Sequence, residues 1–460
     1  MRIKLASSLQ SGNALRAALG VLGAPSFPFW VNGIATDSRE VQTGDLFVAL
    51  RGKRVNGADF TVEAAKNGAA AVLTDEASLI SPLPIWRVEN VASALLRAAA
   101  LHRTACKAFV VAVSGSSGKT TVKEALAAML AERGSVAHSK GNFNSSVGLP
   151  LSVLSFEKTD FWVVELGISH VGEMAPMATA VAPDLAVLTN VGSAHLGHYP
   201  SRESLLFEKA QLCCGLSSRG LALVPAALPV AVFPCGGERL RRFGRGGDFS
   251  LENIVMHKDH VQGDLHGPHL VITNLKWPVT GRIGADALLT VLAAGVLSGL
   301  SVQQLRQGLE RASLTLPRMH IFTVGDLQII DDSYNASPEA MLGALEVLSL
   351  RAAGGFSAAV LGDMLELGRE EATLHRAVGE ALPHFGISAL LTYGTRARWI
   401  AAGARAAGMR ADAIQCFEAE QRDALTKAVC ALPQGTVLFK GSAQNRLSDV
   451  VREVIKQRER

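Results

Sequence analysis

One stretch of seven residues constrains the fold of this chain more than any other. The sequence GSSGKTT occupies residues 115–121, between the apolar run AFVVAV (108–113) and the segment TVKEALAAMLAERG (121–134). The apolar residues of that segment recur at the spacing of one helix face, namely Val122, Ala125, Leu126, Met129 and Leu130. A strand, a glycine-rich turn and an amphipathic helix in this order predict the start of a doubly wound α/β domain.

The glycine-rich turn is typical of a phosphate-binding loop. Gly115 and Gly118 allow the backbone to turn tightly, so that its N–H groups can face a phosphate, and the helix start adds positive potential. Lys119 can neutralise phosphate charge, and the hydroxyl of Thr120 can bind Mg²⁺. The loop has the shorter G-x2-G-K-T form. The alternative to a phosphate-binding loop is a plain strand-to-helix turn with an exposed lysine. We predict that the nucleotide is held by Gly115, Ser116, Ser117, Gly118, Lys119, Thr120 and Thr121.

Further apolar runs extend this pattern into a second part of the chain. FWVVEL (161–166) and LAVLT (185–189) are typical of buried parallel strands, as are LQIIDD (327–332), SAAVLG (357–362), ALLTYG (389–394) and TVLFKG (436–441). The residues before 104 have shorter strands and more turns. A chain of 460 residues has room for about three domains. We predict an α/β protein with a small N-terminal domain (1–104), a central phosphate-loop domain (105–312) and a C-terminal Rossmann-like domain (313–460).

Composition excludes several classes of protein. Lys plus Arg number 45 and Asp plus Glu 41, and a net charge of only +4 argues against a broad nucleic-acid-binding surface. The mean hydropathy is +0.23, yet the longest apolar stretch, residues 285–300, is interrupted by Asp286 and falls short of a membrane span, which predicts a buried helix. The first residues lack a secretory apolar core, and the six cysteines form no CxxC pair. We therefore expect a cytoplasmic protein that binds no nucleic acid and has no membrane span.

Polar residues at strand ends are the remaining candidates for chemistry. Glu165 ends the run at 161–166, and His195 follows the run at 185–189; the carboxyl ends of parallel strands face the ligand crevice. Glu165 fits a Mg²⁺ ligand, with a solvated carboxylate as the alternative, and His195 is either a ligand or a loop histidine. Lys209, considered alone, reads as a surface lysine. Residues 239–248 read as a solvated basic loop, and surface positions are favoured over metal binding for His257, His260, His266 and His269.

The motifs together resemble those of the Mur ligases, the ATP-dependent amide ligases of peptidoglycan synthesis. The matching stretches are the phosphate loop, GNFNSSVGLPL (141–151), VVELGISHVGEM (163–174) and LTNVGSAHL (188–196). In the C-terminal part, IDDSYNASPEAM (330–341), LGDMLELG (361–368) with His375, and VLFKGSAQNR (437–446) resemble the branch that adds D-alanyl-D-alanine. Residues 35–60 resemble the domain that binds the UDP-sugar. The resemblance spans about residues 33 to 451.

The resemblance implies a role for each domain and for particular residues. Thr120 and Glu165 would contact Mg²⁺, His195 would serve a second Mg²⁺, and Lys209 would be carried as a carbamate. Lys119, Glu165, His195 and Lys209 would thus be the catalytic set. The nucleotide side would add Asn142, Arg318 and Asp332. The UDP portion would be contacted by Thr36, Asp37, Ser38 and Arg39, and the acceptor peptide and dipeptide by Asn144, Tyr334, Asn335, Lys440 and Arg446.

The family's chemistry would be carboxylate activation. The terminal carboxylate of UDP-MurNAc-tripeptide would attack ATP, and the acyl phosphate formed would react with D-Ala-D-Ala in an enzyme that acts as a monomer and opens and closes. The alternatives are a sibling ligase, a folylpolyglutamate-type ligase, or a non-catalytic nucleotide-binding regulator. The regulator is an alternative because Ile283, Gly284 and Ala287 stand where the family usually has a His-Asn pair and a later Asn on the adenine side. Ser145 and Pro317 replace a usual Asn and a usual Gly.

Overall fold

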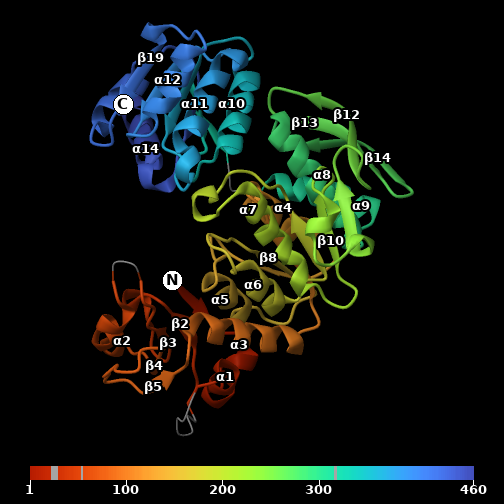
Figure 1. Cartoon of the computed structure of the whole chain (residues 1–460), viewed down its shortest axis with the longest axis vertical. Coiled ribbons are helices and arrows are strands. Elements are labelled where there is room, and N and C mark those ends of the chain that lie inside the picture. Colours follow the sequence, from red (N-terminus) through yellow and green to blue (C-terminus); the bar gives the residue numbers. More distant parts are fainter. Residues whose placement is uncertain (22–28, 53–54, 315–318, 460) are drawn as a thin grey trace.

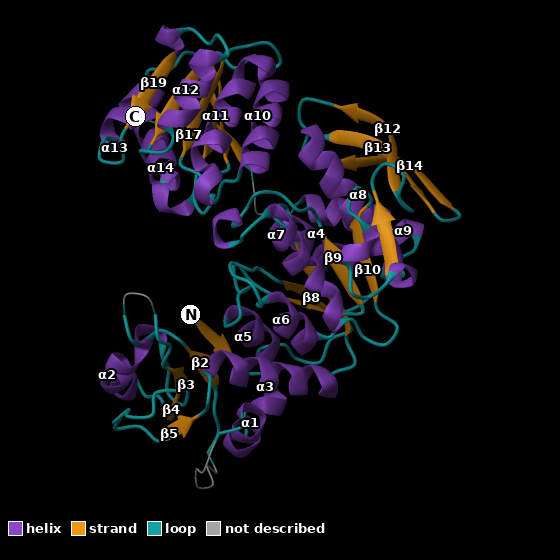
Figure 2. Cartoon of the chain, in the orientation of Figure 1, coloured by secondary structure: helices purple, strands orange, loops and turns teal. Residues whose placement is uncertain are grey.

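The chain forms three α/β parts that follow one another along its long axis (Figure 1). The computed structural model describes residues 1–21, 29–52, 55–314 and 319–459. The N-terminal part lies at one end, the C-terminal part at the other, and the central part lies between them with helices and strands in layers (Figure 2).

The N-terminal part is built on a five-stranded sheet. Its strands lie in the order β1 (Arg2–Lys4), β2 (Gly33–Ala35), β3 (Leu46–Val48), β4 (Ala71–Thr74) and β5 (Ile85–Arg87). Only β1 runs antiparallel to its neighbour. The helices are α1 (Gly12–Leu19), α2 (Thr61–Lys66) and α3 (Val91–Ala105). Helix α3 joins two parts of the molecule, because Leu95 lies in the N-terminal core and Ala99 in a core of the central part.

The central part contains a fully parallel six-stranded sheet. Its order is β11 (Leu240–Phe243), β10 (Leu221–Pro225), β9 (Leu185–Leu188), β6 (Phe109–Ser114), β8 (Phe161–Glu165) and β7 (Val136–His138). Val111 and Val113 of β6 point into one apolar core, and Val110 and Ala112 point into the other. Both faces are covered by helices α4 (Lys119–Leu130), α5 (Gly148–Leu154), α6 (Met174–Val181), α7 (Arg202–Ala210), α8 (Gly281–Leu297) and α9 (Val302–Ser313). The predicted doubly wound arrangement is therefore confirmed.

The apolar stretch at 285–300 falls almost wholly within α8, whose residues 288–295 are all buried. Among the described residues, no helix combines the length and the apolar character that crossing a membrane requires.

A small antiparallel sheet packs beside α8 (Figure 1). It consists of β12 (Ser250–Met256), β13 (Val261–Gly267) and β14 (Leu270–Trp277). The prediction of a basic loop at 239–248 is wrong in part, because strand β11 occupies its start. Leu240 and Phe243 are buried while the two arginines between them are half-buried, so the apolar residues set the local structure. His257 and His260 stack at the β12–β13 turn with ring centroids 4.2 Å apart, and no metal-binding group of three His, Cys, Asp or Glu occurs in the described part of the chain.

The C-terminal part repeats the covered parallel sheet. Its strands lie in the order β15 (His320–Val324), β16 (Leu327–Asp331), β20 (Gly435–Lys440), β17 (Ser357–Gly362), β18 (Ala389–Tyr393) and β19 (Ile414–Phe417), with only β15 antiparallel. The helices are α10 (Pro338–Ala352), α11 (Glu371–Ala381), α12 (Arg398–Ala406), α13 (Arg422–Cys430) and α14 (Leu447–Arg458). The four strands predicted from apolar runs in this part are all present, and an apolar core lies on each face.

Candidate active site

The phosphate loop connects β6 to α4 and depends on both of its glycines. Gly115 has φ 151°, and a Cβ there would lie 1.9 Å from Thr189 Oγ1. Gly118 has φ 76° and caps α4 at its N-terminus. Neither position accepts a larger residue without strain, because side chains disfavour positive φ. The first turn of α4, which includes Thr121, follows the loop directly at the carboxyl end of β6, and the positive end of a helix stabilises an anion there.

The loop is fixed in place by the end of the neighbouring strand β9. Asn190 accepts hydrogen bonds from the amides of Ser116 and Ser117, at its backbone oxygen and its Oδ1 respectively, each at 3.0 Å. Thr189 Oγ1 donates to the Ser117 carbonyl at 2.6 Å. Asn190 directly follows the apolar run at 185–189, and sequence reasoning gave it no role. Its adjacency to the phosphate loop follows from the pairing of β6 with β9.

Two lysines meet at the Gly115 carbonyl oxygen. Lys119 Nζ donates to it at 2.9 Å and Lys209 Nζ at 3.2 Å. Lys209 is 1% exposed on α7, so the reading of it as a surface lysine is wrong: the helix turns Leu205, Glu208 and Lys209 inward. Burial, followed by repulsion from Lys119, lowers the pKa of Lys209 to about 7. An amine with this pKa is largely neutral at physiological pH and can act as a nucleophile.

A buried carboxylate lies beside the loop at the end of β8. Glu165 accepts from Thr120 Oγ1 at 2.9 Å through one oxygen and from Asn144 Nδ2 at 2.7 Å through the other. The carboxylate is 2% exposed. A hydroxyl and a carboxylate held together at a phosphate loop are the oxygen donors that Mg²⁺ prefers, so these residues fit that ion. Asn142, the neighbouring candidate, is exposed in the loop after β7.

Lys123 is part of this arrangement, although sequence reasoning did not identify it. Its side chain is fully buried, and Nζ donates to the Ser139 carbonyl at 2.6 Å. The same nitrogen lies 2.9 Å from Glu124 and 3.9 Å from Glu165. The signal in the sequence was its position four residues after Lys119, which places it on the same face of α4 one turn further on.

His195 belongs to the contact between the central and C-terminal parts. It has φ 65°, and its Nδ1 pairs with the Glu366 carboxylate. This pairing lowers the pKa of Glu366. The structure therefore joins Thr120, Glu165 and Asn144 in one network and Lys119 and Lys209 in another, whereas the side-chain partner of His195 comes from the C-terminal part.

Helix α8 supplies a second contact between these two parts. Ile283, one of the positions that departs from the family pattern, packs against the C-terminal core beside Gly343 of α10, where an added Cβ would lie 2.3 Å from the Ile283 side chain. The Arg282 amide donates to Glu346 at 2.7 Å. The start of α8 is therefore occupied by packing and backbone contacts with α10.

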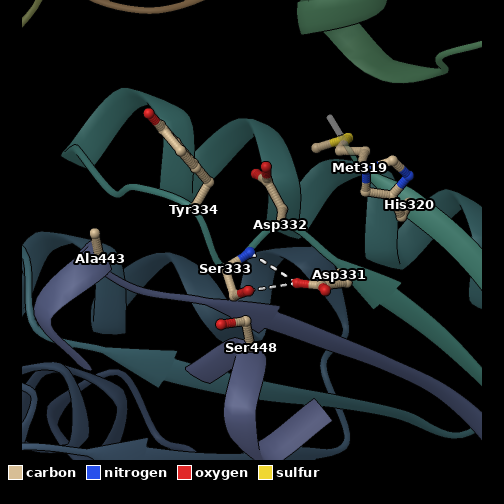
Figure 3. Close-up of a pocket in the computed structure, with 8 residues that line it drawn as sticks. All are labelled: Met319, His320, Asp331, Asp332, Ser333, Tyr334, Ala443 and Ser448. Carbon is tan, nitrogen blue, oxygen red and sulfur yellow. Dashed lines mark hydrogen bonds between the residues drawn. The ribbon is translucent and has the colours of Figure 1, made fainter. Parts of the chain in front are cut away.

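The C-terminal part has a cavity of about 250 Å³ at the end of β16 (Figure 3). Its lining residues are Met319, His320, Asp331, Asp332, Ser333, Tyr334, Ala443 and Ser448. Beside it, the Asp332 carboxylate pairs with Lys440, which is 3% exposed and donates to the Asn335 carbonyl at 3.0 Å. Three predicted residues, Asp332, Asn335 and Lys440, are thus brought together.

One further C-terminal candidate lies elsewhere. Arg446 has φ 52° and pairs with Asp449 at 2.7 Å, directly before α14. Arg318 and Pro317 lie outside the described residues.

The N-terminal candidates form a turn after β2. Asp37 accepts from the Arg39 amide at 3.1 Å and from its Nε at 2.9 Å, and the Arg39 guanidinium holds the pKa of Asp37 well below its usual range. Ser38 Oγ donates to Glu63 at 2.5 Å, and Thr36 Oγ1 donates to the Met1 carbonyl at 3.3 Å. These contacts fix the turn at the carboxyl edge of the sheet.

A cavity of about 260 Å³ lies at the carboxyl ends of β3 and β4, on the same edge of the N-terminal sheet. Its lining residues are Ala49, Arg51, Asn56, Thr74, Asp75, Glu76, Ala77 and Ser78. Sequence reasoning did not identify these residues. The sequence indicated these residues only by their position, since most of them directly follow parallel strands.

Comparisons with known proteins agree with this architecture along the whole chain. Three family models match: the Mur ligase family catalytic domain at residues 31–133, the Mur ligase middle domain at 113–295, and the Mur ligase glutamate ligase domain at 317–443. The UDP-N-acetylmuramoyl-tripeptide–D-alanyl-D-alanine ligase of Bacillus subtilis is 30% identical, covering 96% of this chain and 97% of the relative. The enzyme of the same name from Escherichia coli is 30% identical, covering 92% and 93%.

Solved structures show the same likeness. A crystal structure of MurF from Acinetobacter baumannii aligns with a TM-score of 0.87 at 26% identity, covering 99% of both chains. MurF from Thermotoga maritima in complex with ADP aligns with a TM-score of 0.80 at 30% identity, covering 93% of this chain and 97% of that one. With three family models matched in order and relatives at 30% identity over nearly its full length, this chain belongs to the Mur ligase family.

Proposed function

We propose that the protein is an ATP-dependent ligase that joins D-alanyl-D-alanine to UDP-N-acetylmuramoyl-tripeptide. One observation carries the proposal: a relative named for this activity covers 96% of the chain, so that the likeness includes the C-terminal part as well as the phosphate loop. A sibling ligase for diaminopimelate and a folylpolyglutamate synthase align with TM-scores of only 0.51 and 0.56 at 16% and 15% identity. Their likeness extends to the fold alone.

The reaction proceeds in two transfers. A carboxylate oxygen of the tripeptide attacks the γ-phosphorus of ATP, and the bond from that phosphorus to the bridging oxygen breaks, which yields an acyl phosphate and ADP. The amine of D-Ala-D-Ala then attacks the acyl carbon. The amine loses a proton and phosphate leaves as the amide forms. Because water would hydrolyse the acyl phosphate, the domains close over it, which motivates open and closed forms.

The phosphate loop lowers the repulsion between the carboxylate and the γ-phosphate. Residues 115–121 and the N-terminus of α4 cradle the phosphates, and the Lys119 ammonium lies within reach of them. Thr120 and Glu165 would hold Mg²⁺, whose chemistry when bound is to offset charge on the phosphate oxygens. His195 would serve a second ion. Asn142 and Asp332, together with Arg318, contribute on the nucleotide side.

Lys209 acts as a carbamate in this proposal. Its neutral amine attacks the carbon of CO₂, the nitrogen–carbon bond forms as one C=O π bond opens onto oxygen, and the nitrogen loses a proton, so that a neutral amine becomes an anion able to hold Mg²⁺. The support is the burial of Lys209 and its pKa of about 7. Lys119, Glu165, His195 and Lys209 then form the catalytic set.

Each domain delivers one substrate. We assign residues 1–104 to the UDP-sugar, with contacts from the turn formed by Thr36, Asp37, Ser38 and Arg39. Residues 105–312 hold ATP, and Asn144 lies toward the acceptor peptide. Residues 313–460 deliver the dipeptide, held or enclosed by Tyr334, Asn335, Lys440 and Arg446. The enzyme is cytoplasmic and acts as a monomer on small molecules.

Phosphate release, measured with ATP, UDP-MurNAc-tripeptide and D-Ala-D-Ala and with each omitted in turn, tests this function. Dependence on all three, with formation of the pentapeptide product, is the expected result. Turnover that requires another amino acid in place of the dipeptide would identify a sibling ligase. Nucleotide binding without turnover would identify a regulator, and either result would overturn the proposal.

A further inference from the structure

The segment that follows β9, residues 193–202, forms one seam between the central and C-terminal domains. Three glutamates of the C-terminal domain contact it in succession. Glu339 accepts from the Ser193 amide and hydroxyl, each at 2.9 Å. Glu366 pairs with His195, and Glu370 pairs with Arg202 at 3.0 Å. The segment leads directly into α7, which lies on the side of the central domain that faces the C-terminal domain (Figure 1).

Glu366 contacts residues 193–202 through its backbone as well as through its side chain. The Gly197 amide donates to the Glu366 carbonyl at 2.7 Å, so backbone and side chain of Glu366 both bind the segment. A Cβ on Gly368 would lie 2.7 Å from the Gly197 Cα, so the two backbones approach closely. His195 and Glu366 have φ 65° and 62°, conformations that persist only where surrounding contacts determine them. Glu366 and Glu370 are exposed to a similar extent, at 45% and 48%, but His195 is 26% exposed whereas Arg202 is 53% exposed.

We propose that Glu366 is a positioning residue through which the C-terminal domain sets the orientation and tautomer of His195. This inference rests on the proposed function of His195. A carboxylate on Nδ1 requires the proton there, which leaves the Nε2 lone pair directed away from Glu366 and available as a ligand. The orientation and tautomer of His195, in the central domain, then depend on docking of the C-terminal domain. The Nε2 atom of His195 is available as a ligand only when the two domains are in contact.

The test compares Glu366→Ala and Glu366→Gln with a matched control, Glu370→Gln, which removes a charge from the same seam. Loss of a carboxylate that orients a ligating histidine costs about 10- to 100-fold in activity. We expect Glu366→Ala to lose kcat by that factor with little change in KM for ATP. Glu366→Gln should lose less, because its amide oxygen still accepts from Nδ1–H. Glu370→Gln should match the wild type, because an exposed ion pair contributes little.

Two readouts are independent of turnover. Nitrogen NMR of His195, at a pH where the imidazole is neutral, should show the proton on Nδ1 in the wild type and Glu370→Gln, and a shift toward Nε2 in Glu366→Ala. Hydrogen exchange should show the Gly197 amide still protected in all variants, because it donates to a backbone carbonyl. A wild-type proton on Nε2, equal kcat in Glu366→Ala and Glu370→Gln, or loss of Gly197 protection in parallel with activity would overturn the proposal. Absence of turnover in the wild type would instead refute the proposed function, whereas the NMR and exchange results would still test the Glu366 contact.

Discussion

The buried amine of Lys209 provides the most direct test of the proposed chemistry. Replacing Lys209 by Ala removes the only group that can form a carbamate at this place on α7, while the helix retains its buried Leu205 and its capping box at Ser201. We expect the variant to lose ligation. A short carboxylic acid such as acetate or formate should restore part of the activity, because it can occupy the space with a carboxylate.

The magnitude follows from the pKa of this amine. At a pKa of about 7, roughly three quarters of the Lys209 amine is neutral at pH 7.5, whereas at the ordinary value of 10.5 about one part in a thousand would be. Burial therefore raises the concentration of the reactive form by a factor on the order of several hundred. Carbamate formation at ambient CO₂ depends on this gain, because only the neutral amine attacks CO₂.

The assay is phosphate release in CO₂-depleted buffer and after addition of bicarbonate. Activity of the wild type should fall on depletion and return on addition, and a carbamate carbon should appear in the NMR spectrum with labelled bicarbonate. Lys427→Ala, which removes an exposed lysine on α13, is the matched control and should respond as the wild type does. Near-normal activity of Lys209→Ala, or no labelled carbon in the wild type, would refute the reasoning.

The same pKa predicts how stability depends on pH in CO₂-free buffer. The pKa of Lys209 is lowered on folding, so between about pH 7 and 10.5 the unfolded chain binds more protons and stability rises with pH. Relative to Lys209→Met, the wild type should gain about 2 kcal/mol in free energy of unfolding between pH 7 and 9, because the slope rises from about half of its full value at pH 7 to about 1.4 kcal/mol per pH unit. Urea unfolding at the two pH values measures this difference, and parallel pH profiles of the two proteins would contradict the assigned burial.

Three further predictions concern the loop, the C-terminal cavity and the domain motion. Gly115→Ala should reduce ATP-dependent phosphate release by about 100-fold, because its Cβ would lie 1.9 Å from Thr189 Oγ1 and displace the loop; near-normal turnover would contradict this geometry. Asp332→Asn should lower the free energy of unfolding by about 3 kcal/mol in urea, because it leaves the Lys440 ammonium buried without its counter-charge; an unchanged midpoint and slope would refute the pairing. Small-angle scattering should show compaction with a non-hydrolysable ATP analogue plus UDP-tripeptide, and an unchanged profile would count against domain closure.

The sequence was sufficient to predict the parts of the structure that have a local signature. Strand β8 occupies Phe161–Glu165 within the apolar run at 161–166, because a parallel strand covered on both faces needs uninterrupted apolar residues. The phosphate loop was predictable for the same reason, since its glycines and lysine are adjacent in the chain. Strand β11 was not, because Leu240 and Phe243 lie in opposite cores with two arginines between them, so that its four residues show neither an apolar run nor a simple alternation.

The contacts that determine the site's chemistry were not predictable from local pattern. Lys209 looks like a surface lysine in its own helix, and its burial arises where α7 packs against the phosphate loop, 94 positions away from its partner Gly115. His195 and Glu366 are 171 positions apart, in different domains. The resemblance to a family predicts roles for Lys209 and His195, but neither the residues nor the resemblance indicated their partners.

The Gly115 carbonyl explains why the state of Lys209 matters for the whole loop. Lys119 and Lys209 donate to this one oxygen from 2.9 Å and 3.2 Å, so their nitrogens lie within the combined distance of 6.1 Å. Two ammonium groups this close repel each other in a buried site, and Lys209, the more buried of the two, gives up its proton more readily. Conversion of Lys209 to a carbamate would replace the repulsion between the two lysines by attraction between an anion and the Lys119 ammonium. It would also remove the Lys209 donor from the Gly115 carbonyl. Lys119 would then be the cation beside the loop and the phosphates, opposite two anions, the carbamate and Glu165. Because the carbamate and Glu165 are both negative, the Mg²⁺ that they would hold, together with Lys119, would be what offsets the phosphate charge as the acceptor carboxylate approaches.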